Sequence, residues 1–96
     1  MKIVWSDKAE IDFEENIVFL LKEWNQDVVQ NFTFETERVI SIISKTPKAF
    51  QKHRKMNVHI VPITKHITLF YDVKRNEVQL LRFWNNFKNP KSLKVK

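Results

Sequence analysis

Residues 67–84, ITLFYDVKRNEVQLLRFW, constrain this chain more than any other stretch, because they predict a β-hairpin. The first half alternates with the period of two expected of a strand: Ile67, Leu69, Tyr71 and Val73 on one face, Thr68, Phe70 and Asp72 on the other. After a turn at residues 74–76, the second half places Val78, Leu80, Arg82 and Trp84 opposite Gln79, Leu81 and Phe83. Both faces of this second strand are largely apolar, so we expect it to lie inside a sheet and to be covered on both sides.

Two amphipathic helices are predicted upstream of the hairpin. A short strand at residues 2–5 ends at Ser6, which is a good helix N-cap. The first helix has an apolar stripe made of Ala9, Phe13, Ile17, Leu20, Leu21 and Trp24. After a break at residues 25–26, Asp27 and Gln30 resemble a capping box, and the helix should stop near residues 45–46, before Pro47. The core face of this second helix is expected to be Val28, Phe32, Val39, Ile40 and Ile43.

The segment between the second helix and the hairpin completes the predicted fold. Residues 50–55 alternate weakly and suit a strand or an ordered loop, whereas residues 58–63 suit a strand in which Pro62 requires an edge or a bulge. We therefore expect a single α+β domain over residues 1–96: strand, helix, helix, then three or four antiparallel strands, with the two-helix hairpin on one face of a twisted sheet. Residues 91–96 are expected to be a flexible tail.

The chain has neither glycine nor cysteine, and both absences exclude functions. Without glycine there is no P-loop, dinucleotide-binding fingerprint or nucleophile elbow, and asparagine (Asn57, Asn76 and Asn85) is expected to supply the turns. Without cysteine there is no disulfide or thiolate metal site. The histidines His53, His59 and His66 have spacings that match no zinc pattern. We expect no metal and no cofactor.

Charge is distributed unevenly along the chain, whose formal net charge is +6. Residues 1–44 contain four basic and nine acidic side chains, whereas residues 45–96 contain thirteen and two. A sheet-forming half this basic predicts an acidic partner, which is either nucleic acid or an acidic protein segment. The simpler alternative is a solubilising basic face.

Candidate site residues lie in the basic half. Lys52, Arg54 and Lys55 form the densest cluster and suit contacts with phosphates, or else a solvated loop. Arg82 lies within an apolar strand, where an unpaired charge is costly, so it either emerges at the sheet surface or pairs with an acid such as Asp72. His59 is the one plausible general base; the alternative is an ordinary strand histidine.

The segment that follows the last strand, residues 85–90, is where the sheet surface would carry its chemistry. Asn85, Phe87 and Lys88 are candidates for target binding here. Trp84 and Phe87 suit stacking on bases or contact with a partner protein, and we favour packing for Trp84.

The sequence resembles the RelE/ParE family of bacterial toxin–antitoxin toxins along nearly its whole length. Ile3-Val4-Trp5-Ser6, followed by Ala9 and Asp12, is similar to the start of the family, and Pro47 is similar to the proline at the end of its second helix. Tyr71 is similar to an aromatic strand residue of the family, and residues 78–84 followed by Pro90 resemble its last strand.

This resemblance implies the toxin of a type II (plasmid stabilisation) system, acting inside the cell and neutralised by a cognate acidic antitoxin that wraps it as helix and strand. RelE-like members cleave mRNA in the ribosome with basic residues and a His or Tyr near the chain end. ParE-like members poison DNA gyrase. The resemblance also implies that the chain can oligomerise through the antitoxin. The sequence itself has no apolar run of about 20 residues and no signal-peptide pattern, so we expect a cytoplasmic protein with no membrane segment.

Three positions depart from the nuclease pattern: Thr68 stands where an arginine is usual, Asn85 where many relatives have histidine, and Phe87 where an arginine is expected. Asparagine cannot act as a general base. The departures favour a ParE-like, non-nucleolytic toxin. The alternatives are a ribosome-dependent mRNA endonuclease that uses Lys52, Arg54, His59 and Arg82, and a non-toxic RNA-binding or adaptor domain of the same fold. The sequence leaves open whether the chain is an enzyme.

Overall fold

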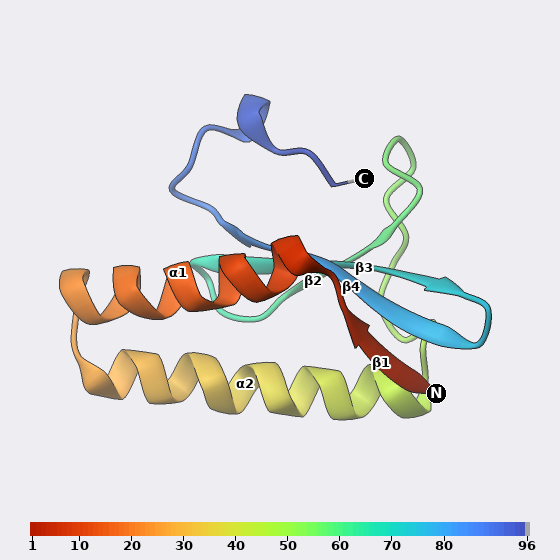
Figure 1. Ribbon diagram of the computed structural model, residues 1–96, viewed down its shortest axis with the longest axis horizontal. Helices are drawn as coiled ribbons and strands as arrows, with labels where there is room; N and C mark the ends of the chain where they lie inside the picture. The colour runs from red at the N-terminus through yellow and green to blue at the C-terminus, as the bar shows by residue number, and fades with distance from the viewer. Residues whose placement is uncertain (96) are drawn as a thin grey trace.

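The computed structural model describes residues 1–95 as two helices packed on one face of a four-stranded sheet (Figure 1). The elements are β1 (Lys2–Trp5), α1 (Asp7–Glu23), α2 (Gln26–Lys45), β2 (His59–Pro62), β3 (Ile67–Lys74), β4 (Glu77–Asn85) and the short 3-10 helix η1 (Pro90–Ser92). This order confirms the predicted α+β class and the strand–helix–helix–strands arrangement.

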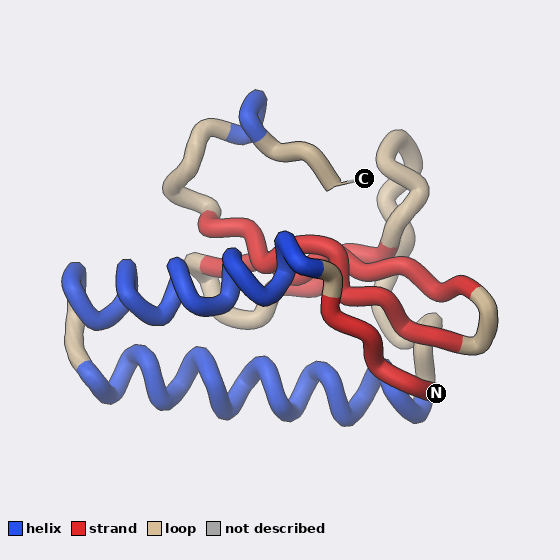
Figure 2. Tube along the Cα trace, in the orientation of Figure 1, coloured by secondary structure: helices blue, strands red, loops and turns tan. Residues whose placement is uncertain are grey.

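The sheet has the strand order β1-β4-β3-β2, so the second hairpin strand is internal, as predicted. β2, β3 and β4 are antiparallel neighbours, whereas β1 pairs parallel with β4. Pro62 lies in the edge strand β2, where its missing N–H breaks no ladder. Figure 2 shows the sheet between the helices and the C-terminal segment.

Turns without glycine are made partly as expected. Arg75 and Asn76, between β3 and β4, have φ of 54° and 62°, and Asn57 has φ of 58°. Asn85 was expected to act in the same way and does not, because it is the last residue of β4. The non-asparagine Arg75 takes a left-handed position instead, which the tight two-residue connection requires.

A β-bulge changes which side chains of β4 face the helices. In the pairing of β3 with β4, Phe70 opposes Arg82 and Tyr71 opposes Leu80. Leu81 therefore has no partner on β3 and is the extra residue of the bulge. Val78 and Leu80 belong to the core beneath the helices, and beyond the bulge Phe83 joins them. The prediction that Arg82 and Trp84 share a face with Leu80 is therefore wrong.

The helices begin at polar caps and bury more polar residues than expected. The Ser6 hydroxyl accepts from Ala9 N, as predicted, but α2 is capped by Asn25, whose side chain accepts from Val28 N, and not by Asp27. Leu21 and Trp24 are 51% and 43% exposed and lie off the α1 core face. The buried face of α1 includes the polar residues Asp12 and Asn16 in addition to Ala9 and Leu20. The buried residues of α2 are Val29, Phe32, Thr36, Val39 and Ile43. Val28 and Ile40, which were expected in the core, are only partly buried.

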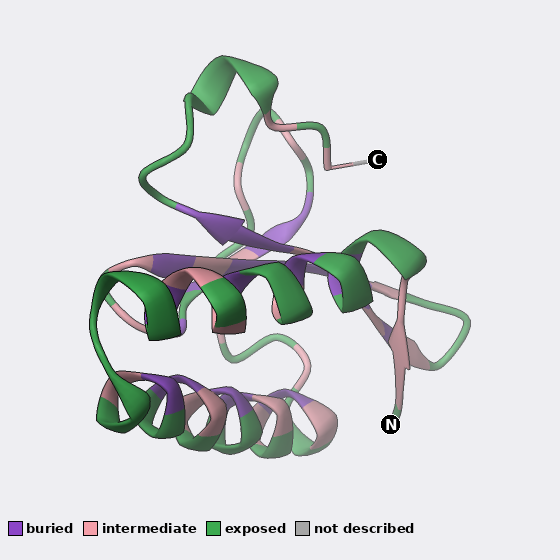
Figure 3. Cartoon of the chain, turned by 60° about the vertical axis from the view of Figure 1, so that its left-hand side comes forward, coloured by how far each residue is buried: buried purple, intermediate pink, exposed green. Residues whose placement is uncertain are grey.

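A second apolar cluster lies on the sheet face that the helices leave free. Val58, Phe70 and Trp84 are its buried members, and Leu93 and Val95 of the C-terminal segment pack against it. Figure 3 shows the burial of the helix faces turned towards the sheet and the exposure of their outer faces. Both faces of β4 are thus covered, which the apolar pattern predicted. Flexibility of the tail remains a prediction.

Candidate functional site

The basic loop, defined as residues 51–55, lines a cavity of about 530 Å³ together with Ile60. Lys52, Arg54 and Lys55 are exposed, and no salt bridge in residues 1–95 involves them. This places three of the predicted phosphate-contact residues at one cavity. Apart from the bridge between Lys52 and His59, the segment forms no strand.

The turn inside the basic loop is held by His53. Its Nδ1 accepts from Lys55 N and Met56 N, each at 3.2 Å, while Asn57 N donates to His53 O at 2.8 Å. Because Nδ1 is an acceptor, the neutral ring carries its proton on Nε2 and has that donor free for a ligand. Asn57 closes the turn in its left-handed conformation. The cations therefore sit on a turn with several backbone restraints.

Two aromatic side chains anchor the chain just before the basic loop. The Tyr71 hydroxyl donates to Pro47 O at 2.7 Å, and His59 Nδ1 bonds Phe50 O at the same distance. The two rings stack with centroids 4.8 Å apart. Burial raises the pKa of Tyr71 above its usual value of 10.0. A carbonyl only accepts, so Nδ1 of His59 carries the proton and only Nε2 could act as a base.

Arg82, by contrast, is held in a mostly buried ion pair with Asp12 of α1, in which the Arg82 and Asp12 side chains are 13% and 6% exposed. Its Nε and Nη2 donate to the two carboxylate oxygens at 2.6 and 3.0 Å, and its Nη1 donates to Lys94 O at 2.8 Å. Of the two predicted alternatives, pairing with an acid is the one observed, but the acid is Asp12 and not Asp72, whose Oδ2 lies 3.6 Å from Lys74 Nζ. The hydrogen bond to Asp12 raises the pKa of Arg82.

The same carboxylate also fixes β4 itself. Asp12 Oδ2 accepts from Phe83 N at 3.0 Å, and Asn16 Nδ2, one helical turn later, donates to Phe83 O at 2.9 Å. These bonds satisfy both backbone groups of Phe83. Asp12 and Asn16 are spaced by four residues beside the apolar stripe of α1, so they lie on the same side of the helix. This spacing is the sequence signal for the two bonds to Phe83, and the sequence-based prediction overlooked it.

The four residues named for a nuclease mechanism do not form a single cluster. Lys52 and His59 are bridge partners, and Arg54 follows in the same loop. Arg82 of β4 pairs with Phe70 of β3, which in turn pairs with Ile60 of β2, a residue that lines the cavity. The backbone of Arg82 is therefore two strand spacings, or about 10 Å, from that of Ile60. Arg82 does not line the cavity.

The segment after β4 is fixed by asparagine side chains. Asn85 is buried, and its Oδ1 accepts from Phe87 N at 2.9 Å. Thr68 Oγ1 donates to Asn86 Oδ1 at 3.0 Å, and Asn86 Nδ2 donates to Lys65 O at 3.2 Å. Phe87, 63% exposed, projects from this segment.

Lys88 is half exposed near two groups: its Nζ lies 5.8 Å from the Trp84 ring centroid and 3.8 Å from Glu15. Trp84 itself is buried, in agreement with the packing role that we favoured. In the part of the chain that the structure describes, no three His, Cys, Asp or Glu side chains are grouped to hold a metal ion. No helix in that part is long and apolar enough to cross a membrane.

Comparison with solved structures finds the same fold in bacterial toxins. A chain of the chromosomal ParDE toxin–antitoxin system of P. aeruginosa superimposes with a TM-score of 0.72 at 15% identity, over 88% of this chain and 95% of that one. A YoeB/ParE toxin from Agrobacterium tumefaciens gives 0.63 at 18% identity, over 90% and 99%. A copper-bound mutant toxin from Helicobacter pylori gives 0.62 at 20% identity, over 91% and 96%. No protein-family model matches the sequence, and a search of curated proteins finds no match. The fold is therefore that of the RelE/ParE toxins.

Proposed function

We propose that this chain is the toxin component of a type II toxin–antitoxin system, of the ParE-like, non-nucleolytic type, acting in the cytoplasm. The observation that carries the proposal is the match of almost the whole chain to a ParDE chain and a YoeB/ParE toxin. The exposed basic loop supplies the surface for an acidic target, either gyrase with its DNA or the ribosome with its mRNA.

The absence of nuclease activity is supported by the positions that depart from the nuclease pattern. Asn85 is buried and caps Phe87 N, and Thr68 is bonded to Asn86, so both side chains already have structural partners. Phe87 has no titratable group. Cleavage through a 2′-hydroxyl needs proton transfer and stabilisation of phosphorane charge, and none of these three supplies either.

The sheet edges indicate where an antitoxin strand would add. At β1, Trp5 pairs with Leu80, and Ser6 N donates to Leu80 O. In this parallel register the backbone N–H and C=O groups of Ile3 and Trp5 point away from β4, so they are available to a further strand. At β2, Pro62 has no N–H and Ile60 N already donates to Gln51 O. We therefore assign the antitoxin strand to β1.

A mRNA endonuclease is the second candidate, favoured by the pairing of Lys52 with His59 beside Arg54. In that mechanism the loop cations would stabilise the phosphate and Nε2 of His59 would have to take the proton, although His59 is buried against Tyr71 and does not line the cavity. A non-toxic RNA-binding or adaptor domain is the third.

Growth after induction of the chain alone separates these functions. The variant Lys52→Ala/Arg54→Ala is compared with Lys74→Ala/Arg75→Ala, which removes the same charge at the hairpin tip. We expect arrest by the wild type and the hairpin variant but not by the loop variant, with intact mRNA and inhibited gyrase supercoiling. Codon-positioned mRNA cuts would establish the nuclease instead. Absence of arrest in the wild type would leave only the adaptor.

A further inference from the structure

We propose that neutral His53 is the positioning residue of the basic loop: its Nδ1 folds the turn that presents the loop cations, and a proton on that nitrogen releases the turn. Protonation of this histidine therefore weakens anion binding instead of strengthening it. The consequence for binding rests on the proposed function of the loop as a target surface, whereas the consequence for the turn does not.

Two backbone amides of the turn depend on the His53 ring. Lys55 N and Met56 N, two and three residues further along the chain, both donate to Nδ1 at 3.2 Å. A protonated imidazole has a donor on each nitrogen and no acceptor. Protonation thus removes both hydrogen bonds and places an N–H group against two other N–H groups.

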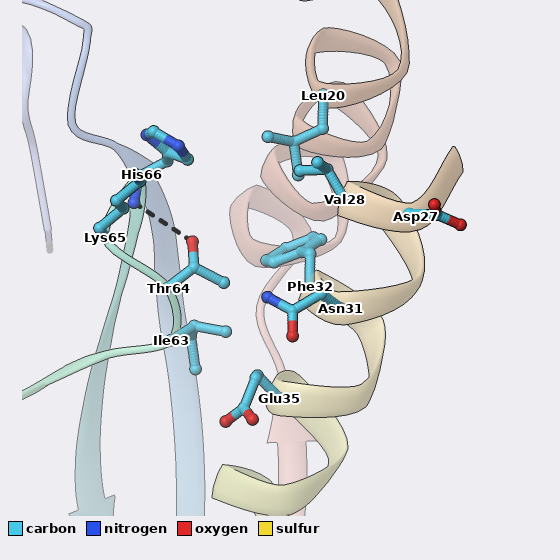
Figure 4. Close-up of a pocket in the computed structure, with 10 residues that line it drawn as sticks. All are labelled: Leu20, Asp27, Val28, Asn31, Phe32, Glu35, Ile63, Thr64, Lys65 and His66. Atoms are coloured by element: carbon cyan, nitrogen blue, oxygen red, sulfur yellow. Dashed lines mark hydrogen bonds between the residues drawn. The ribbon is translucent and has the colours of Figure 1, made fainter. Parts of the chain in front are cut away.

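Other turns and helix starts of the chain are capped by side chains that do not titrate near neutral pH. Asn85 Oδ1 accepts from Phe87 N, two residues further on, at 2.9 Å. Thr64 Oγ1 accepts from His66 N in the same way at 3.2 Å (Figure 4). Further caps of this kind are made by Ser6, Asn25 and Asn89. Compared with these caps, the one in the basic loop has an acceptor that a proton can block.

The His53 ring is accessible to protons while the sheet stays folded. His53 is partly exposed and lines the cavity, and histidine changes charge between about pH 5 and 8. Two bonds of its backbone do not involve the ring: His53 N donates to Val58 O at 2.7 Å, and Asn57 N donates to His53 O at 2.8 Å. These bonds hold the ends of the turn, so protonation frees the two capped amides without unfolding β2.

The ionisable groups on the elements packed against the turn are basic. On the basic loop they are Lys52, Arg54 and Lys55, and no carboxylate lines the cavity. β2 contributes His59, the bridge partner of Lys52. The C-terminal segment, which packs in one apolar cluster with Met56, contributes Lys94. A protonated ring would add one more positive charge here, so a purely electrostatic role predicts stronger anion binding at low pH. The sign of the pH effect therefore separates the two roles.

The first measurement is an NMR titration of the full chain between about pH 8 and pH 5.5. It compares the wild type with His53→Asn, which keeps an uncharged acceptor, and with His53→Ala, which has none. At the high pH we expect the wild-type ring to carry its proton on Nε2, and the amides of Lys55 and Met56 to be ordered. At the low pH these two amides should shift, gain fast motion and resemble those of His53→Ala, whereas His53→Asn should stay unchanged. A neutral ring protonated on Nδ1, or wild-type amides that ignore the titration of the ring, would overturn the proposal.

The second measurement is the affinity for a short oligothymidylate, a phosphodiester probe whose charge is constant over this pH range. From the high to the low pH, the affinity of the wild type relative to His53→Asn should fall about threefold, which corresponds to roughly one lost hydrogen bond. A rise of this ratio would show that His53 acts as a cation and would overturn the proposal. Absence of binding at either pH would overturn the binding consequence together with nucleic acid as the target in the proposed function, while the amide signals would still decide whether His53 folds the turn.

Discussion

Two sets of basic side chains on the sheet-forming half differ in almost every physical respect. Arg82 is only partly exposed, is bonded to both oxygens of Asp12 and to Lys94 O, and has its guanidinium carbon over the Trp84 ring, 5.6 Å from the centroid. Lys52, Arg54 and Lys55 are exposed around an open cavity with no carboxylate among its lining residues. The sequence named all four as candidates for target binding and left open, for Arg82, the alternative of pairing with an acid.

The difference shows that pairing, and not charge alone, determines what a cation can do. A guanidinium whose donors are already used inside the protein fixes α1, β4 and the C-terminal segment relative to one another. The loop cations retain their donors for a ligand, at the cost of mutual repulsion. We therefore assign stability to Arg82 and recognition to the loop.

The largest expected effect is the loss of stability on breaking the buried pair. Asp12→Ala leaves Arg82 with little solvent and removes the acceptor of Phe83 N, which should cost about 3–5 kcal/mol of unfolding free energy. Denaturant unfolding measures this directly. Lys52→Ala/Arg54→Ala should change the same quantity by less than about 0.5 kcal/mol.

The double variant Asp12→Leu/Arg82→Met sharpens this comparison. Replacing both charges by apolar side chains removes the unpaired group, so much of the stability lost in Asp12→Ala should return. If Asp12→Ala lowered the free energy of unfolding no more than Lys52→Ala/Arg54→Ala does, Arg82 would not have a stabilising role. It would then belong with the loop cations as a residue for target recognition.

The fold was largely predictable because local signals agreed. Alternation predicted β3, apolar stripes predicted α1 and α2, and Pro62 predicted either an edge strand or a bulge, of which the structure shows the edge strand. The bulge at Leu81 was not predictable, since an apolar residue fits either face of a strand covered on both sides. This one extra residue is what turned Arg82 away from Leu80.

The candidate site was predictable only where sequence neighbours form it. Lys52, Arg54 and Lys55 are consecutive or nearly so, and the structure places them at one cavity. The Asp12–Arg82 pair joins residues 70 apart, and a second cavity joins α2 to residues 63–66. No local periodicity contains such contacts, because they depend on how the helices pack against the sheet.

The next effect concerns the anchor beneath the basic loop. Burial raises the pKa of Tyr71 above 10.0, so above pH 10 the unfolded chain loses this proton while the folded chain keeps it. The contribution of Tyr71 to stability is therefore complete below pH 10 and declines as the pH rises from there to the folded-state pKa. Tyr71→Phe should remove this decline and cost about 1 kcal/mol at neutral pH through the lost bond to Pro47 O.

Tyr71 is the single tyrosine of the chain, so ultraviolet absorbance of tyrosinate reports its ionisation alone. A titration midpoint at or below 10 in the folded protein would show that the anchor is open to solvent. The basic loop would then lack the rigid base that distinguishes it from a solvated turn.

The smallest effect comes from Arg75, a third kind of basic residue, exposed at the hairpin tip with φ of 54°. Arg75→Gly relieves a left-handed conformation that costs a non-glycine residue about 1–2 kcal/mol, and the greater freedom of glycine in the unfolded chain offsets part of the gain. We expect a net stabilisation of about 0.5 kcal/mol, measured by thermal unfolding. The variant removes the same charge as Arg54→Ala but should leave growth inhibition intact. If both variants lost inhibition equally, net charge, and not the position of the basic loop, would govern contact with the target.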